Sequence, residues 1–119
     1  MKTGLEFSRK VDTAYMALCK PLCKKWHLTQ TALDILMFLA NNPEFTTARD
    51  IVEIRKLKAN LVSVNVDRLV REGYLVRQEV AGDRRKTKLL CTSKADELIT
   101  QGRKLQQDFV ALLFAGIDE

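Results

Sequence analysis

The stretch GDRRKTKLLCT, residues 82–92, begins with a turn, places four cations within its first seven positions and ends in an apolar run. Ahead of it, Tyr74 to Val80 alternates loosely between apolar and polar residues, and Ala81-Gly82-Asp83 is a turn signal. Thr87 to Cys91 then has the composition of a second short strand. The pattern predicts a β-hairpin with a cationic tip.

Two short helical segments precede this hairpin. Thr47, followed by Asp50 at the third position after it, resembles a capping box that starts the first of them. After a break at Arg55 to Lys58, residues Asn60 to Glu72 have the spacing of a second helix, and Gly73 is its stop signal. Two short helices joined by a tight break predict a helix-turn-helix.

Two longer helices at the start of the chain and a final helix complete the pattern. Leu5 to Lys25 has helical spacing, although Pro21 predicts a kink or an early end. Thr29 is the expected N-cap of the next helix, which has almost no polar face and should therefore be the most buried element. The segment after the hairpin has the apolar stripe of a last helix.

The composition suits a single soluble domain with an anionic partner. The chain has 119 residues, and twenty Lys and Arg against fifteen Asp and Glu give a net charge of +5. No apolar stretch approaches the roughly 18 residues that span a bilayer, and Glu6 without a nearby apolar segment argues against export. Three cysteines, an odd number, indicate a reducing cytoplasm. With one histidine, no Gly-rich phosphate loop and no nucleophile paired with a base, we expect neither an enzyme nor a cofactor.

The order helix, helix, helix-turn-helix, hairpin, helix predicts a mainly α fold with a small β-hairpin. This is a winged helix-turn-helix flanked by one N-terminal and one C-terminal helix, and in this arrangement the sequence resembles the MarR family of bacterial transcriptional regulators. The family's wing pattern is Asp-Arg-Arg, a few strand residues, then Leu-Thr, and residues 83–92 match it with Cys91 in the Leu place. Residues 61–75 resemble the family's recognition helix and its exit, and residues 113–117 resemble the segment before its final helix.

The resemblance implies one winged helix-turn-helix domain over residues 1–119. Its DNA-binding core would comprise residues 28–92, and its dimerisation helices residues 1–27 and 93–119. Such a protein would act in the cytoplasm as a homodimer on a pseudo-palindromic operator in double-stranded DNA. The resemblance also implies a small apolar or phenolic effector that binds in a cleft between the first, second and last helices.

In the family, the second helix of the motif reads the major groove and an Arg at the wing tip enters the minor groove. By this resemblance, Arg85 would be the inserted cation, Asp83 would fix its guanidinium and Arg84 would meet phosphate. On the recognition helix, the edge that projects near the N-terminal end comprises Asn60, Leu61, Ser63 and Val64. Sequence-independent phosphate contacts are predicted for Thr47, Lys56, Lys58, Arg68, Lys86 and Lys88.

Three positions depart from the family's pattern. Lys56 stands where a turn Gly is expected, and Lys58 where the recognition helix usually has a Ser cap. Either the turn is remodelled, or the helix begins at Asn60, whose side chain can cap. Val64 stands where many members carry a basic side chain, so base reading is weaker than usual or depends more on apolar contact with thymine methyls.

For the remaining candidate site residues, and for the function of the whole protein, the sequence leaves a second interpretation open. Trp26 and His27, at the corner between the first two helices, are candidate ligand-binding residues, although His27 could equally be a partly exposed loop histidine. Cys19 and Cys23 could suggest a redox switch or a metal site, but two thiols make an incomplete zinc site, and we expect buried hydrophobes there, as for Cys91. For the whole protein, the alternative is a winged helix whose basic wing meets an acidic protein partner instead of DNA.

Overall fold

The computed structural model describes the backbone of residues 2–117 and the side chains of residues 4–83 and 86–115. Within that part of the chain it contains five α-helices, a short 3-10 helix and one antiparallel strand pair, which confirms the expected mainly α fold with a small hairpin. None of the described helices combines the length and the apolar character needed to cross a membrane. The elements are α1 (Lys2–Trp26), α2 (Gln30–Asn41), α3 (Ala48–Arg55), α4 (Ala59–Arg71), β1 (Leu75–Val80), β2 (Asp83–Cys91), η1 (Ser93–Ala95) and α5 (Asp96–Ile117).

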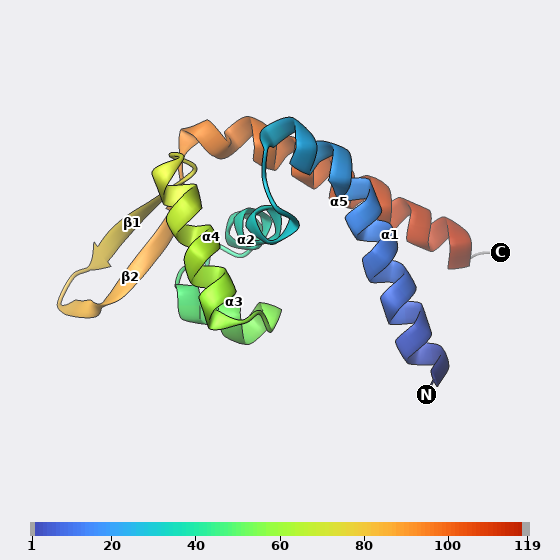
Figure 1. The fold of residues 1–119 in the computed structure, drawn as a ribbon, viewed down its shortest axis with the longest axis horizontal. Coiled ribbons are helices and arrows are strands. Elements are labelled where there is room, and N and C mark those ends of the chain that lie inside the picture. Colours follow the sequence, from blue (N-terminus) through green and yellow to red (C-terminus); the bar gives the residue numbers. More distant parts are fainter. Residues whose placement is uncertain (1, 118–119) are drawn as a thin grey trace.

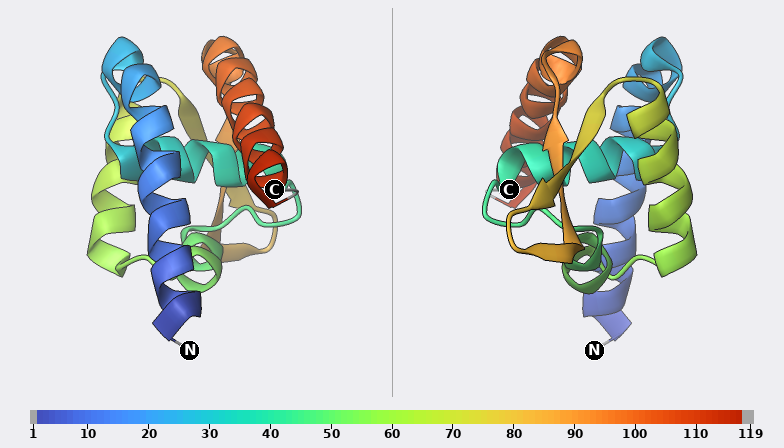
Figure 2. Two further views of the ribbon diagram at one scale, coloured as in Figure 1. Left: turned by 90° about the vertical axis from the view of Figure 1, so that its right-hand side faces the viewer. Right: turned by 90° about the vertical axis from the view of Figure 1, so that its left-hand side faces the viewer.

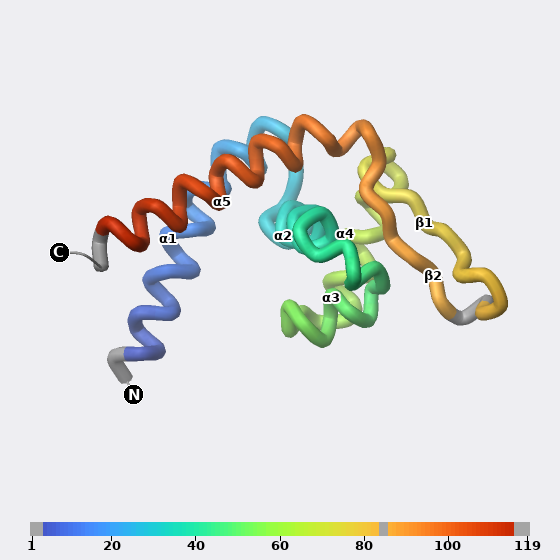
Figure 3. The backbone as a smooth tube through the Cα atoms, turned by 180° about the vertical axis from the view of Figure 1, so that it is seen from behind, coloured from blue at the N-terminus to red at the C-terminus, as the bar shows by residue number. Residues whose placement is uncertain are grey.

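The molecule is elongated, with extents of 53 × 32 × 22 Å. The hairpin lies at one end, and α1 and α5 both extend toward the other end, where the chain termini lie (Figure 1). Helix α2 crosses between the α1 side and the α5 side (Figure 2). Seen from behind, α3 lies on the side of α2 away from α5 (Figure 3). The helix-turn-helix and the hairpin therefore occupy the half of the molecule opposite the termini.

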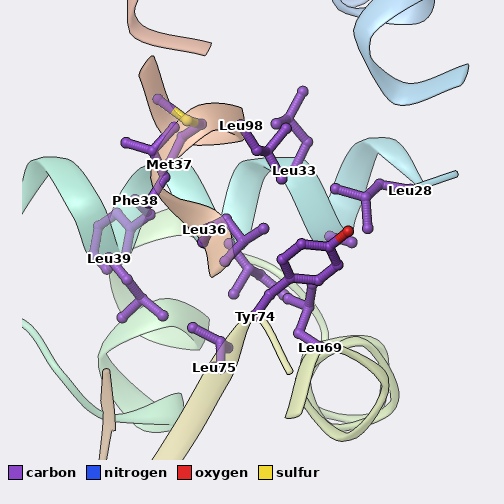
Figure 4. Close-up of a cluster of buried hydrophobic side chains, with 14 of the residues drawn as sticks. Leu28, Leu33, Leu36, Met37, Phe38, Leu39, Leu69, Tyr74, Leu75 and Leu98 are labelled. Atoms are coloured by element: carbon purple, nitrogen blue, oxygen red, sulfur yellow. The ribbon is translucent and has the colours of Figure 1, made fainter. Parts of the chain in front are cut away.

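Helix α2 forms the centre of the hydrophobic core, as its nearly continuous apolar sequence predicts. Seven of its residues are buried, and Leu33 and Leu36 are at most 1% exposed. Around it, Leu69 of α4, Leu75 of β1 and Leu98 of α5 complete the cluster (Figure 4). Because full burial of a Leu side chain stabilises a protein by about 1.5–3 kcal/mol, α2 is the element that holds the other helices and the hairpin together.

Helix α1 continues through Pro21 to Trp26, so of the two outcomes expected there the early end is wrong, and a kink at Pro21 remains a prediction. Pro21 lacks the amide that would bond to the preceding turn, but Leu22 beside it is buried in the core, and this packing keeps the segment helical. The helix ends instead at Trp26, and His27 directly after it has a left-handed φ of 55°. Beyond it, the Leu28 amide donates to the Cys23 carbonyl at 2.9 Å, the bond that characterises a Schellman cap.

The helix-turn-helix begins with the predicted capping box. The Asp50 amide donates to Thr47 Oγ1 at 3.1 Å, and the Thr47 amide donates to Asp50 Oδ2 at 3.2 Å. Helix α3 ends at Arg55, and its C-cap Lys56 has a left-handed φ of 54° and ψ of 44°. This is the conformation for which glycine is expected, so the turn is not remodelled and Lys56 adopts the glycine geometry.

Helix α4 begins at Ala59, one residue before the start that we expected. Lys58 is the N-cap and makes no side-chain bond to the helix. Asn60 lies in the first turn, where its Oδ1 accepts the Leu61 amide at 2.9 Å. At the other end, Gly73 has a φ of 86° and stops the helix as predicted.

The hairpin has the predicted antiparallel pairing, but its second strand is longer than the sequence indicates. The regular register ends with Glu79 opposite Thr87. A bulge follows, in which residues 84–86 have no partner in the described register. Val80 then pairs with Asp83, and β2 therefore starts at Asp83. Gly82 supplies the left-handed turn residue, with a φ of 84°.

Lys56→Gly should stabilise the protein, because glycine adopts the left-handed region without the clash that a Cβ causes. We expect its free energy of unfolding to exceed that of Lys56→Ala, which loses the same charge but keeps a Cβ, by about 0.5–1 kcal/mol. Denaturant unfolding followed by circular dichroism measures both variants. Equal stabilities would contradict a left-handed Lys56.

Candidate DNA-binding face

Helix α4 has a buried face and an exposed face along its length. Val62, Val66 and Leu69 pack into the core and are at most 3% exposed. The opposite face presents Leu61 and Val64, which are 41% and 67% exposed. The other two predicted edge residues, Asn60 and Ser63, are exposed as well. The first two turns of α4 therefore project side chains away from the core, as a helix that enters a groove requires.

Hydrogen bonds to the start of α2 hold α4 in place. Asn65 is only 6% exposed, and the Thr29 hydroxyl donates to its Oδ1 at 2.8 Å, while its Nδ2 donates to the Leu61 carbonyl at 2.8 Å. The same Thr29 oxygen accepts the Ala32 amide at 3.0 Å, which confirms Thr29 as the N-cap of α2. Because a buried amide left without partners costs about 1–3 kcal/mol, these bonds favour one orientation of α4.

Arg68, a predicted phosphate contact, has two partners within the protein. Its Nη2 donates to the His27 carbonyl, and its Nε donates to Glu72 Oε1 at 3.3 Å. Its side chain is 31% exposed. Arg68 therefore does not lie with the exposed edge of α4 but beside the corner between α1 and α2, where it adds a second attachment for α4. A contact with phosphate remains a prediction.

The hairpin is joined to the helix-turn-helix at two points. The Leu89 amide donates to the Thr46 carbonyl at 2.6 Å, which ties β2 to the segment just before α3. Arg77 of β1 forms an ion pair with Asp67 of α4 through Nη2 and Oδ1. The hairpin and α4 therefore form one connected surface, in which each fixes the position of the other.

Most of the predicted phosphate contacts lie on two exposed segments. One segment is the turn that leads into α4, and the other is β2 in and directly after its bulge. Thr47 differs from the rest, because it is half-buried and its Oγ1 caps α3. The exposed cations of the two segments are Lys56, Lys58, Lys86 and Lys88.

The wing tip holds Arg84 and Arg85, for which the family resemblance implies contacts with DNA. The backbone of Arg84 and Arg85 belongs to the bulged part of β2, whereas their side chains lie outside the described residues. Asp83 is partly exposed. Insertion of Arg85 into a minor groove, its pairing with Asp83 and a phosphate contact by Arg84 therefore remain predictions.

The two predicted ligand residues have structural partners at the corner between α1 and α2. Trp26 Nε1 donates a hydrogen bond to Gln101 Oε1 of α5 at 3.0 Å. His27 is exposed, and its backbone carbonyl accepts a hydrogen bond from the Arg68 guanidinium. Among the described residues that line the cavity between α1, α2 and α5, neither is present. A ligand role for Trp26 and His27 remains a prediction, and the candidate ligand cavity lies elsewhere.

This cavity has a volume of about 370 Å³ and lies between α1, α2 and α5. Its walls include the apolar Phe38 and Phe109 and the polar Tyr15 and Asp34. Burial raises the pKa of Tyr15 to about 12, so its hydroxyl stays protonated, and burial also raises the pKa of the Asp34 carboxyl. Asp34 Oδ2 lies 3.9 Å from Arg55 Nη2 at the end of α3. The resemblance implied a cleft between these helices, but none of these four lining side chains was predicted from the sequence as a site residue, because only the fold brings them together.

The three cysteines behave as the sequence analysis expects. Cys19 is fully buried, and Cys23 and Cys91 are half-buried against the core. Burial raises the pKa of the Cys23 and Cys91 thiols, which disfavours the reactive thiolate. In the structure, the three cysteines therefore pack as small hydrophobic side chains.

Arg68→Met should separate a positioning role from a phosphate contact. If Arg68 only holds α4 through His27, the substitution lowers affinity for specific DNA but leaves its salt dependence unchanged. Lys86→Met is the matched control, because loss of a true phosphate contact flattens the slope of log affinity against log salt by about 0.9. Fluorescence anisotropy titrations at several salt concentrations measure the DNA affinity and its salt slope for both variants. A salt slope that is flattened equally by Arg68→Met and Lys86→Met would assign Arg68 to a phosphate contact.

Comparison with known proteins places these elements in a family. The MarR family profile matches residues 27–86, about half of the chain, whereas a search of curated protein sequences returned no significant match. Transcriptional regulator PA3341 is 26% identical, with a TM-score of 0.83 over 98% of this chain and 85% of that one. A MarR transcriptional regulator from Methanosarcina mazei Go1 is 17% identical, with a TM-score of 0.81 over 97% and 82% of the two chains. MepR of S. aureus, in a complex with DNA, is 16% identical, with a TM-score of 0.70 over 91% and 81%.

The matched region contains the central helix, the helix-turn-helix and the turn of the hairpin. The solved structures extend the agreement in fold to nearly all of the chain. This combination of elements is the one that the wing pattern and the recognition-helix segment indicated. The chain belongs to the MarR family.

Proposed function

We propose that this protein is a cytoplasmic transcriptional regulator that binds a pseudo-palindromic operator in double-stranded DNA as a homodimer. Membership in the MarR family supports the proposal, and MepR, which has the same fold, was solved in a complex with DNA. The net charge of +5 favours a polyanionic partner. The proposal includes no catalytic step, in keeping with solved relatives that are transcriptional regulators.

The connected surface of α4 and the hairpin carries this proposal. Two attachments, Leu89 to Thr46 and Arg77 to Asp67, join the wing to the helix-turn-helix. A helix of this diameter fits the major groove, and a hairpin beside it can then reach the neighbouring backbone and minor groove. The exposed lysines before α4 and along β2 supply cations for phosphate at both sites.

The terminal helices supply a surface for a second copy of the chain. Phe7 and Met16 on α1 are 57% and 52% exposed, and Leu112 and Phe114 on α5 are 61% and 63% exposed. Large apolar side chains gathered on two helices at one end of a molecule are a feature of interfaces between subunits. A two-fold axis there would leave both wings at the far ends of the dimer. The two recognition helices would then face successive major grooves, with half-sites about one helical turn apart.

Binding to a genomic DNA library tests the proposal. The full-length protein should retain a limited set of fragments that share a pseudo-palindromic sequence, with affinity that falls steeply as salt concentration rises. Arg85→Ala should lower that affinity without unfolding the protein, whereas Arg9→Ala, which removes the same charge from an exposed site on α1, should not.

Three results would count against the proposal. Retention without sequence selection and without a salt slope would refute DNA recognition and favour an acidic protein partner for the wing. Equal affinities for Arg85→Ala and Arg9→Ala would refute the role of the wing. Sedimentation as a monomer at micromolar concentration, or selected sites without two-fold symmetry, would refute the dimer.

The cavity between α1, α2 and α5 is the proposed site for a small apolar or phenolic effector. Phe38 and Phe109 offer apolar walls, and the Tyr15 hydroxyl accepts a hydrogen bond from Gln106 Nε2 at 3.1 Å and can donate to a ligand oxygen. The site borders both a terminal helix and, through Asp34 and Arg55, the end of α3. A ligand that changes this packing would change the position of the helix-turn-helix relative to the dimer helices.

A panel of small phenolic and apolar compounds tests the effector site. A compound that fills the cavity should raise the melting temperature of the protein and lower its affinity for the selected operator, because it favours one arrangement of the helices. Tyr15→Phe should weaken binding of a phenolic compound, while operator affinity without the compound stays unchanged. Compounds that bind equally well to Tyr15→Phe, or that bind without any effect on DNA affinity, would contradict this assignment.

A further inference from the structure

We propose that α4 reads A·T base pairs in the major groove through thymine methyl groups, with Leu61 and Val64 as the residues that determine specificity. The inference rests on the proposed DNA-binding function and names the chemistry of the base sequence that the protein selects. Three features of α4 lead to it: an exposed apolar pair, the lack of a cation on the same edge, and an acid that is already paired.

Leu61 and Val64 form the exposed apolar pair. They are three residues apart on a helix, so their side chains are neighbours on one face. Leu61 is 41% and Val64 is 67% exposed. One exposed apolar residue needs no special explanation. Two adjacent ones at the N-terminal turns of the second helix in a helix-turn-helix lie where such helices contact base edges.

The same edge lacks the groups that read a G·C pair. Guanine presents two acceptors in the major groove, and bidentate Arg or Lys is its commonest partner, yet no Lys or Arg occurs between Ala59 and Asp67. Arg68, the next cation, donates to the His27 carbonyl. Cytosine presents a donor that Asp or Glu can accept, but Asp67 is paired with Arg77.

The remaining residues of the edge are compatible with A·T pairs, although their donors could also meet guanine N7 and O6, so the discrimination depends on the apolar pair. Asn60 Oδ1 accepts the Leu61 amide, which leaves Nδ2 to donate to adenine N7 or thymine O4. The exposed Ser63 hydroxyl can donate to the same acceptors. Neither contact requires a cation. The thymine C5 methyl is then the one major-groove group that matches Leu61 and Val64, since apolar contact removes its surface from water.

Deoxyuridine substitution tests the inference, because it removes only the C5 methyl of thymine. In the operator that the full-length protein selects from random DNA, thymines are replaced one at a time. We expect one or two replacements in each half-site to weaken binding about fourfold each, the effect of one methyl-sized group. Replacements in the flanking sequence that faces the wings should have no effect, because the methyl projects into the major groove.

Variants of the protein test which side chain of α4 contacts each thymine methyl. In Val64→Ala, binding should lose the preference for thymine over deoxyuridine at one position of each half-site, and Leu61→Ala should lose it at another. Both positions are exposed and alanine is a strong helix former, so α4 should stay folded. Val76→Ala, which truncates a 46% exposed valine on β1, is the matched control and should keep every preference.

The outcomes separate this inference from the function on which it rests. Failure of the wild-type protein to select any sequence would overturn DNA recognition, and the inference with it. A selected operator whose affinity is unchanged by every deoxyuridine, or whose half-sites contain only G·C pairs, would overturn the inference alone. Unaltered thymine preferences in both Leu61→Ala and Val64→Ala would also overturn it, because the methyl would then have another partner.

Discussion

The hydrogen bond between Thr29 and Asn65 sets the direction in which α4 lies on the core. Apolar packing around α2 sets the distances between the helices, but apolar contact is non-directional and does not fix the orientation of each helix. A hydroxyl that caps α2 and an amide that is 6% exposed define one geometry, because each satisfies the other. Arg68 adds a second fixed point through the His27 carbonyl. The exposed edge of α4 therefore projects from a fixed base.

In the proposed function, DNA recognition uses two kinds of surface. The edge of α4 around Val64 is apolar and uncharged, so it can contribute discrimination between bases but little salt-dependent affinity. The described lysines of this face lie before α4 and on the wing, where the proposed contacts with phosphate would supply affinity at any sequence. Because the Leu89 amide and the Arg77 guanidinium join the hairpin to the helix-turn-helix, the proposed function has both surfaces approach DNA together.

Features that depend on short-range chemistry could be predicted from the sequence, and features that depend on packing could not. The capping box at Thr47 and the stop at Gly73 were predicted because each uses neighbouring residues. Of the kink or early end expected at Pro21, the early end was wrong, because burial of the adjacent turn outweighs one lost hydrogen bond. The exposed edge of the candidate site followed from helical spacing, whereas the bond between Arg68 and His27 joins residues 41 positions apart and required the fold.

The central claim is that the first turns of α4 and the wing meet DNA as one connected surface. Hydrogen exchange of the full-length protein, with and without its selected operator, measures this most directly, because it reports protection segment by segment. We predict that DNA slows exchange in residues 56–64 and 81–88 together, at the same DNA concentration. Slowing in only one of these segments, or confined to α1 and α5, would contradict the claim.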